Sequence, residues 1–185
     1  REKNLNIIIE EVDRLNLLVE DILDLSKIQS KSVELNVERF NLNELIKETI
    51  NKFEILCEKD GYIISYEGFD IEIVADKKKI QQTIYNLINN AINYTGKDKK
   101  VYVKLFEIND IVRVEVIDTG NGIDKKDIKY IWDKYYKVDK KYKRVNYGTG
   151  LGLSIVRNVL ELHGFNYGVD SKKGNGTKFY FDIKK

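Results

Sequence analysis

The chain has 185 residues, of which 42% are hydrophobic and 34% charged, and its formal net charge is +2. This composition supports a folded core in one or two domains and does not indicate a nucleic-acid binder. The single cysteine, Cys57, excludes an internal disulfide and a cysteine metal cluster and fits a reducing compartment; we expect it to be a core thiol.

No apolar stretch approaches the ~20 residues that a helix needs to cross a bilayer, and no segment resembles a signal peptide. We therefore expect this chain to be soluble. Because it begins with Arg1 rather than methionine, we also expect it to be a fragment of a longer protein.

The opening segment carries apolar residues that step alternately by three and four positions. They are Leu5, Ile8, Val12, Leu15, Val19 and Ile22. Such a seam predicts an amphipathic helical arm that packs against partner helices. The alternative is a single helix that folds onto its own domain.

The next part of the chain alternates between strand and helix patterns. Val33, Leu35 and Val37 predict a strand, and Asn41 with Glu44 predicts a capped helix to about residue 58. Strands are predicted at 62–66 and 71–74.

Asp76 is predicted to cap a helix whose apolar residues recur at helical spacing. Asn86, Asn90 and Asn93 fall at i, i+4 and i+7, so they form a stripe of amides on one side of it. Asparagine is a poor helix former, so the stripe costs stability. It is either a solvated polar face or a source of an amide oxygen ligand for Mg²⁺.

A hairpin is predicted from residues 101–108 and 111–117, and its second strand places Val112, Val114 and Val116 on one face. Asp118 continues this apolar face and opens the segment Asp-Thr-Gly-Asn-Gly-Ile at 118–123. A buried carboxylate needs donors, and the exocyclic amine of adenine is one, with the two glycines leaving room for a flat base. The alternative is an Asx-type turn that closes the strand.

The stretch 148–156, Gly-Thr-Gly-Leu-Gly-Leu-Ser-Ile-Val, passes from alternate glycines into a helix-compatible run. Such a turn suits phosphate, because the helix start offers unpaired N–H groups and the positive end of its dipole; a plain strand-to-helix connection is the alternative. The helix is predicted to end at His163 with Gly164 as its cap, and strands follow at 167–171 and 178–183. The fold class is therefore α/β, a two-layer sandwich with helices on one face of a mixed sheet, preceded by the helical arm.

In this order and at these separations, the segments resemble the ATP-binding region of bacterial sensor histidine kinases, whose fold is shared with DNA gyrase and MutL-type ATPases. Residues 86–94 are similar to the N box, 118–123 to the G1 box and 148–153 to the G2 box. Residues 131–139 are similar to the F box, and 174–177 to the last glycine motif. The likeness covers nearly the whole chain.

The resemblance implies ATP and Mg²⁺ as ligands and a role for each matching residue. Asn90 is the implied metal ligand, Asp118 the acceptor of the adenine amine and Tyr94 a base-stacking residue. Asn86 and Lys137 are the implied catalytic positions. The full set implied to bind the nucleotide is Asn90, Asn93, Tyr94, Asp118, Gly120, Gly122, Ile123, Tyr136, Lys137, Gly148, Thr149, Gly150, Leu151, Gly152, Leu153 and Thr177.

The resemblance also implies a domain plan. Residues 1–31 would be the second helix of a dimerisation hairpin, with the junction at 27–31, and residues 32–185 the catalytic domain. The full-length protein would be a homodimer anchored in the membrane by upstream segments, with this part in the cytoplasm. The basic run between Lys134 and Arg144 is an ordinary solvated loop or, by resemblance, part of a lid over the triphosphate.

Three positions depart from the family pattern. Lys137 stands where arginine is frequent, which weakens bidentate phosphate binding there. Asn93 stands where lysine is usual, and Trp132 is the aromatic residue of the F box. The chain has no proline, and its only histidine, His163, lies outside the position of the phosphoacceptor.

The resemblance implies a protein-histidine kinase that gives the γ-phosphate of Mg-ATP to a histidine outside this chain, for transfer to an aspartate of a response regulator. Gyrase-type ATPases place a glutamate base where this chain has Asn86, and an amide takes no proton at neutral pH. A gyrase-type ATPase and a nucleotide-binding interaction module without kinase activity remain as alternatives.

Overall fold

The computed structural model of the chain describes residues 19, 34–136 and 150–184. The predicted arm, apart from Val19, lies outside these residues, as do the predicted junction at 27–31 and most of the basic run. In chain order the elements are β1 (Val37–Asn41), α2 (Leu42–Asn51), α3 (Glu54–Asp60), β2 (Ile63–Glu67), β3 (Glu72–Asp76), α4 (Lys77–Tyr94), β4 (Lys100–Ile108), β5 (Ile111–Asp118), α5 (Gly152–His163), β6 (Asn166–Ser171) and β7 (Thr177–Lys184).

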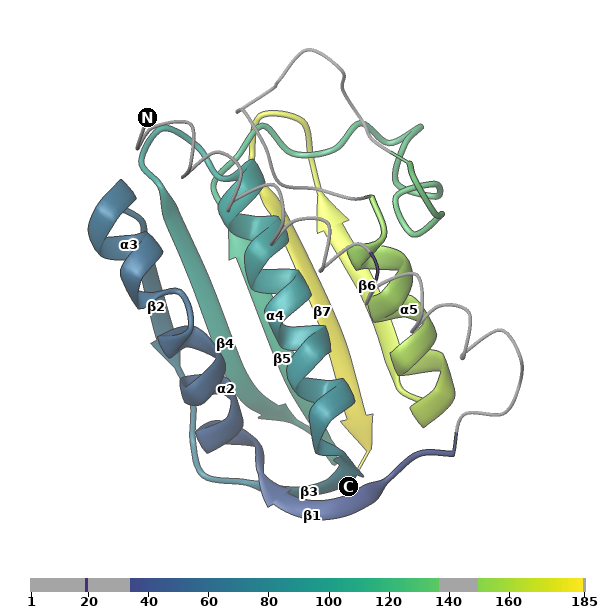
Figure 1. Cartoon of the computed structure of the whole chain (residues 1–185). Coiled ribbons are helices and arrows are strands. Elements are labelled where there is room, and N and C mark those ends of the chain that lie inside the picture. Colours follow the sequence, from purple (N-terminus) through teal and green to yellow (C-terminus); the bar gives the residue numbers. More distant parts are fainter. Residues whose placement is uncertain (1–18, 20–33, 137–149, 185) are drawn as a thin grey trace.

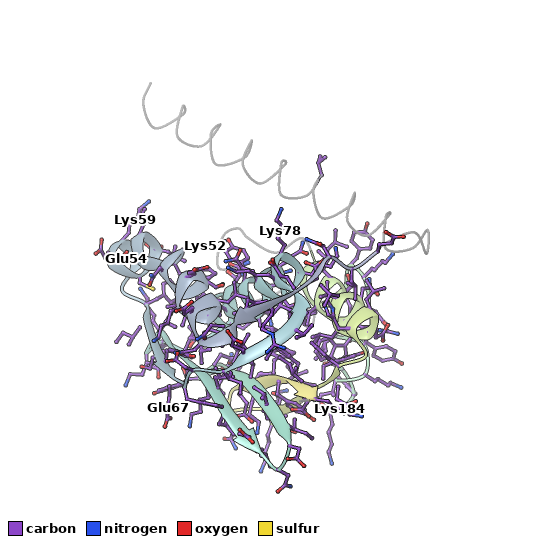
Figure 2. All side chains as sticks on the ribbon, turned by 90° about the horizontal axis from the view of Figure 1, so that it is seen from below. Lys52, Glu54, Lys59, Glu67, Lys78 and Lys184 are labelled. Atoms are coloured by element: carbon purple, nitrogen blue, oxygen red, sulfur yellow. The ribbon has the colours of Figure 1, made fainter. Side chains whose placement is uncertain are left out.

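The main sheet of the described residues is mixed and has five strands in the order β2-β4-β5-β7-β6. Only the β2–β4 pair is parallel; the other neighbours are antiparallel. The helices cover one face of this sheet (Figure 1). Figure 2 shows the same two layers from below, with Lys52 and Lys78 on the helix side and Glu67 on the sheet side. The predicted two-layer α/β sandwich is confirmed.

The core lies between the helices and the inner face of the sheet. Alternate residues of the three central strands are buried, as the period of two in their sequences predicts. They pack against the apolar stripes of α4 and α5. The largest fully buried side chains are Phe179, Phe181, Leu42, Leu45, Ile46, Ile80, Ile84, Leu87, Ile88, Leu151, Ile155 and Leu160.

The first predicted strand is wrong in its position. Residues 34–36 have no regular structure, and β1 begins where the predicted strand 33–37 ends. It pairs antiparallel with β3, from Val37 opposite Asp76 to Asn41 opposite Glu72, in a separate two-stranded sheet. The pairing partner, rather than the alternation of apolar residues, decides where this strand lies.

The helix predicted from residue 41 to about 58 is interrupted. Its start is confirmed, because Asn41 Oδ1 accepts the backbone N–H of Glu44 at 3.2 Å. However, α2 ends at Asn51, and Phe53 leaves the helical conformation to become buried in a stack on Tyr85, with ring centroids 4.8 Å apart. Cys57 on α3 is half-buried and packs against the core, so its prediction as a core thiol is confirmed only in part.

The other predicted elements are confirmed to within a few residues. Asp76 caps α4 through a bond from the N–H of Lys79 to its Oδ1 at 3.1 Å. The hairpin turns at Asn109, which has a φ of +46°, and α5 ends at Gly164, with a φ of +67°. No helix within the described ranges has the length and apolar character of a membrane span.

Candidate functional site

Three polar residues form a row across the inner face of the sheet, where the rest of the central strands is apolar. In the strand register Asp118 of β5 lies opposite Thr177 of β7, and Thr177 lies opposite Ser171 of β6. Asp118 is 3% exposed and Thr177 5%. Neighbouring side chains on one face of a sheet lie close enough to interact. Asp118, Thr177 and Ser171 therefore line one end of the core with polar side chains, and we call this row the polar wall.

Asp118 is a buried carboxylate with few donors. Its Oδ1 accepts the N–H of Gly120 at 2.8 Å, and its carboxylate also accepts the N–H of Thr177. Burial outweighs these bonds and raises the pKa of Asp118 to about 6. The bond to Gly120 forms an Asx turn, so the predicted Asx-type turn at the end of the strand is confirmed. The Asp118 carboxylate still has lone pairs for another donor. The two interpretations of Asp118 do not exclude each other.

The glycines around Asp118 allow backbone segments to touch. A Cβ atom on Gly120 would lie 1.9 Å from the carbonyl oxygen of Tyr94, at the end of α4. Gly122 has a φ of +66°, and its Cβ would lie 2.2 Å from the carbonyl oxygen of Lys172. The sequence interpretation assigned this space to a flat base, whereas the protein's own backbone fills it. The glycines therefore join the segments that surround Asp118.

Sequence reasoning missed three hydroxyl residues that hold these segments together. Thr95, just after α4, and Thr119 share a hydrogen bond at 2.9 Å, and Thr95 also donates to the carbonyl of Lys100 at 2.6 Å. Ser171 accepts the N–H of Ile123 at 2.8 Å. Thr95 directly follows the motif at 86–94 and Thr119 lies within that at 118–123, and this proximity was the one sequence signal that could have found them. Ser171 lies in neither motif, and strand register alone places it near Thr177.

One member of the asparagine stripe, Asn86, faces the start of α5. Asn86 Oδ1 lies 3.6 Å from where a Cβ of Gly152 would stand, at the first residue of α5. Its Nδ2 is buried without a hydrogen-bond partner in the described part of the chain. The solvated-face interpretation is therefore wrong for Asn86. Asn90 and Asn93 are half-buried, one and two turns further toward the end of α4 that contacts the Asp118 segment.

The described part of the glycine loop leads directly into α5. Gly150 has a φ of +76°, and its carbonyl accepts the N–H of Tyr135 at 2.9 Å. The N-cap residue is the buried Leu151, which makes no side-chain cap, so the first turn suits an external anion. Leu153 is half-buried against the core. Lys137, Gly148 and Thr149 lie outside the described residues.

The two aromatic residues predicted to bind the nucleotide differ in their surroundings. Tyr94 is 55% exposed at the end of α4. The Tyr136 hydroxyl donates to Asp127 at 2.7 Å, and its ring lies 5.6 Å from that of Tyr130. Trp132 packs edge-on against Tyr167 and Phe179, which anchors this segment to the sheet.

The motifs therefore gather toward one end of the molecule: the ends of α4 and β5 lie at the upper end in Figure 1, and α5 begins beside the middle of α4. The end of α4 contacts the segment after β5, the turn before β7 contacts Asp118, and Asn86 contacts the start of α5. Within the described residues, the site combines a buried charged acceptor with a helix start whose N-cap residue makes no side-chain cap.

A sequence-family model described as histidine kinase-, DNA gyrase B-, and HSP90-like ATPase matches residues 75–185, which include all these motifs. The chain belongs to this family. It is 34% identical over 176 residues to sensor histidine kinase WalK of Bacillus subtilis, covering 94% of this chain and 29% of WalK. The chain thus spans less than a third of that relative.

Solved structures agree. The catalytic domain of histidine kinase ThkA matches with a TM-score of 0.70 and 31% identity, over 83% of this chain and 97% of that domain. ThkA in complex with the response regulator TrrA matches with a TM-score of 0.77 and 32% identity, over 99% of this chain and 51% of ThkA. Full-length ShkA with AMPPNP matches with a TM-score of 0.81 and 25% identity, over 94% of this chain and 36% of ShkA. The chain therefore carries the catalytic ATPase domain of the sensor histidine kinase family.

Proposed function

We propose that this chain binds Mg-ATP at the end of the sheet where the motifs meet and donates its γ-phosphate to a histidine outside the chain. The observation that carries the proposal is the buried carboxylate of Asp118, on the side of the molecule where the motifs gather, in a chain of the ATPase family. A histidine of this kind would pass the phosphate to an aspartate of a response regulator. ThkA, which is similar to this chain, is solved with such a regulator.

Each part of the site has a role in this proposal. Asp118 accepts the exocyclic amine of adenine, and Thr177 completes the polar wall beside it. Tyr94, exposed at the end of α4, stacks on the base. The first turn of α5 and the loop before it hold the phosphates through backbone N–H groups. Binding positions proposed from the family pattern are Asn93, Gly120, Gly122, Ile123, Tyr136, Lys137, Gly148, Thr149, Gly150, Leu151, Gly152 and Leu153.

The donor set of the site fits magnesium. The described residues contain no group of three His, Cys, Asp or Glu side chains that could hold a metal. Mg²⁺ in nucleotide sites needs few protein ligands, because substrate phosphates and water complete its shell. The amide oxygen of Asn90, one turn after Asn86, would be its protein ligand. The ion would neutralise charge on the phosphates.

Asn86 favours phosphoryl transfer over hydrolysis. Its side chain lies beside Gly152, at the helix start proposed to hold phosphate. A carboxylate there would serve as a base for water, but an amide takes no proton at neutral pH. This favours a kinase over a gyrase-type ATPase.

The domain plan is part of the same proposal. Residues 1–31 would be half of a dimerisation hairpin, and residues 32–185 the catalytic domain of a homodimer whose upstream segments anchor it in the membrane.

Calorimetric titration with Mg-ATP and with ADP, with hydrolysis followed in the same samples, tests the proposal. We expect binding of both with negligible hydrolysis. Rapid turnover would favour a gyrase-type ATPase, and absence of binding would leave an interaction module. Adding a separate hairpin polypeptide that carries a histidine should then give an acid-labile phosphoprotein.

A further inference from the structure

The hydroxyl group of Ser171 has all of its hydrogen-bonding capacity in use. It donates to the carbonyl of Gly176 at 2.9 Å and accepts the N–H of Ile123 at 2.8 Å. A third bond, at 3.0 Å, joins it to Thr177 Oγ1. A serine hydroxyl has one proton and two lone pairs, so these three bonds saturate it.

This saturation determines the direction of the bond to Thr177. The proton of Ser171 points to the carbonyl of Gly176, because a carbonyl can only accept. The proton between Ser171 and Thr177 therefore belongs to Thr177. The Oγ1 atom of Thr177 is left with lone pairs and no proton to offer a ligand.

Thr177 and Asp118 lie opposite each other in the register of β5 and β7, and both are buried. The Asp118 carboxylate, when ionised, is also an acceptor only. The two side chains of the wall that face one another across these strands therefore offer acceptors and no donor. These acceptors can form hydrogen bonds with an N–H group of a ligand, but they repel the lone pairs of a carbonyl oxygen.

We infer that Ser171 determines base specificity: by taking the proton of Thr177, it keeps the polar wall free of donors, so that the site selects a base with an exocyclic amine over one with a keto group. This inference rests on the proposed function, because it assumes that the base lies at the Asp118–Thr177 wall. Ser171 acts through Thr177 and is a positioning residue.

Adenine and hypoxanthine nucleotides are suitable probes, because hypoxanthine carries a keto oxygen where adenine has the amine. A keto oxygen beside Asp118 and Thr177 would meet lone pairs only, and a site built for an N–H donor rejects such an analogue strongly. We expect the wild-type chain to bind ADP at least a hundredfold more tightly than IDP.

Ser171→Ala frees the proton of Thr177. The freed proton either turns toward the base, which strengthens IDP binding, or takes a lone pair of Asp118, which weakens ADP binding. In both cases the ratio of IDP to ADP dissociation constants should fall, by about tenfold. Ser171→Thr keeps one proton and two lone pairs at this position and should restore the wild-type ratio.

Calorimetric dissociation constants for ADP and IDP on the wild type, Ser171→Ala and Ser171→Thr decide the matter. If Ser171 only braces the loop, Ser171→Ala will weaken both nucleotides equally and the ratio will not move, which overturns the inference. If Ser171→Ala does not fold, Thr177→Val, which removes an acceptor without adding a donor, should lower the ratio; an unchanged ratio would overturn the inference equally. A wild-type chain that binds neither nucleotide would instead refute the proposed function.

Discussion

The Nε2 atom of His163 accepts a hydrogen bond from the backbone N–H of Asp76 at 3.1 Å. The other ring nitrogen, Nδ1, lies 2.8 Å from the carbonyl of Val159 and donates to it, which fixes the tautomer. The side chain of Asp76 caps α4 and also accepts the N–H of Asn36 at 3.0 Å. The only histidine of the chain thus joins the end of α5 to the start of α4, and neither nitrogen is open for phosphorylation.

His163→Ala should lower the free energy of unfolding by about 1–3 kcal/mol, because the N–H of Asp76 is left without its acceptor. His163→Gln places an amide oxygen near the position of Nε2 and should recover part of the loss. Urea denaturation of the three proteins measures both effects. Equal stability of the alanine and glutamine variants would show that the hydrogen bond contributes little.

Asp118→Asn should abolish nucleotide binding while the fold remains. The amide offers an N–H group where the adenine amine needs an acceptor, so the ligand would meet a donor. The apo-protein should gain roughly 1–3 kcal/mol at neutral pH, because a poorly compensated buried charge is removed. Thermal melting and ADP calorimetry measure the two effects. Unchanged ADP affinity would remove Asp118 from the adenine pocket.

The raised pKa of Asp118 predicts an unusual pH dependence of stability. Its pKa rises from the ordinary 3.8 to about 6 on folding, so the folded state binds this proton more tightly than the unfolded state. The contribution of Asp118 is therefore most favourable below about pH 4, is lost as the pH rises to about 6, and is constant above. The total is roughly 3 kcal/mol. Urea denaturation between pH 4 and 7.5 should show Asp118→Asn gaining on the wild type across this window; a constant difference would contradict the assignment.

Nucleotide affinity should also depend on the protonation of Asp118. It should rise with pH over the range in which the contribution of Asp118 to stability falls. The adenine amine favours the ionised carboxylate, so ADP should bind more weakly below about pH 6 and release a proton when it binds near that pH. Calorimetry in buffers of different ionisation enthalpy measures the proton release.

Two glycines of one turn form a matched pair. Gly174 and Gly176 both have positive φ, +88° and +75°. An added Cβ meets nothing within 4 Å at Gly174, but lies 2.1 Å from the carbonyl oxygen of Asp118 at Gly176. Gly174→Ala should cost about 1–2 kcal/mol of backbone strain. Gly176→Ala should cost clearly more and weaken ADP binding, since the Asp118 backbone must move. Similar losses in chemical denaturation would argue against this close approach.

Asn90→Ala should remove the dependence of triphosphate binding on Mg²⁺, because the amide oxygen proposed to bind the ion is lost. Asn89→Ala is the control, since Asn89 is also half-buried on α4 but lies off the stripe. ATP titrations with Mg²⁺ and with EDTA compare the variants. If the dependence persists in Asn90→Ala, the ion is bound elsewhere.

Local sequence patterns predicted the position of a helix or strand correctly where that position depends only on the residues of the element itself. The alternation of Val112, Val114 and Val116 predicted β5, and the caps at Asn41 and Gly164 placed helix ends, because period and capping are short-range properties. They failed at Phe53 and at β1, where a distant partner, Tyr85 or β3, determines the conformation.

The sequence by itself determined the order of motifs, the family, and the burial of Asp118, since each depends on residue types at fixed spacing. Only the tertiary structure decided that Asp118, Thr177 and Ser171 form one row, that backbone fills the space at Gly120, and that Asn86 lies beside Gly152. These relationships come from strand register and helix packing between segments far apart in the chain, and a one-residue change of register would send each side chain to the other face.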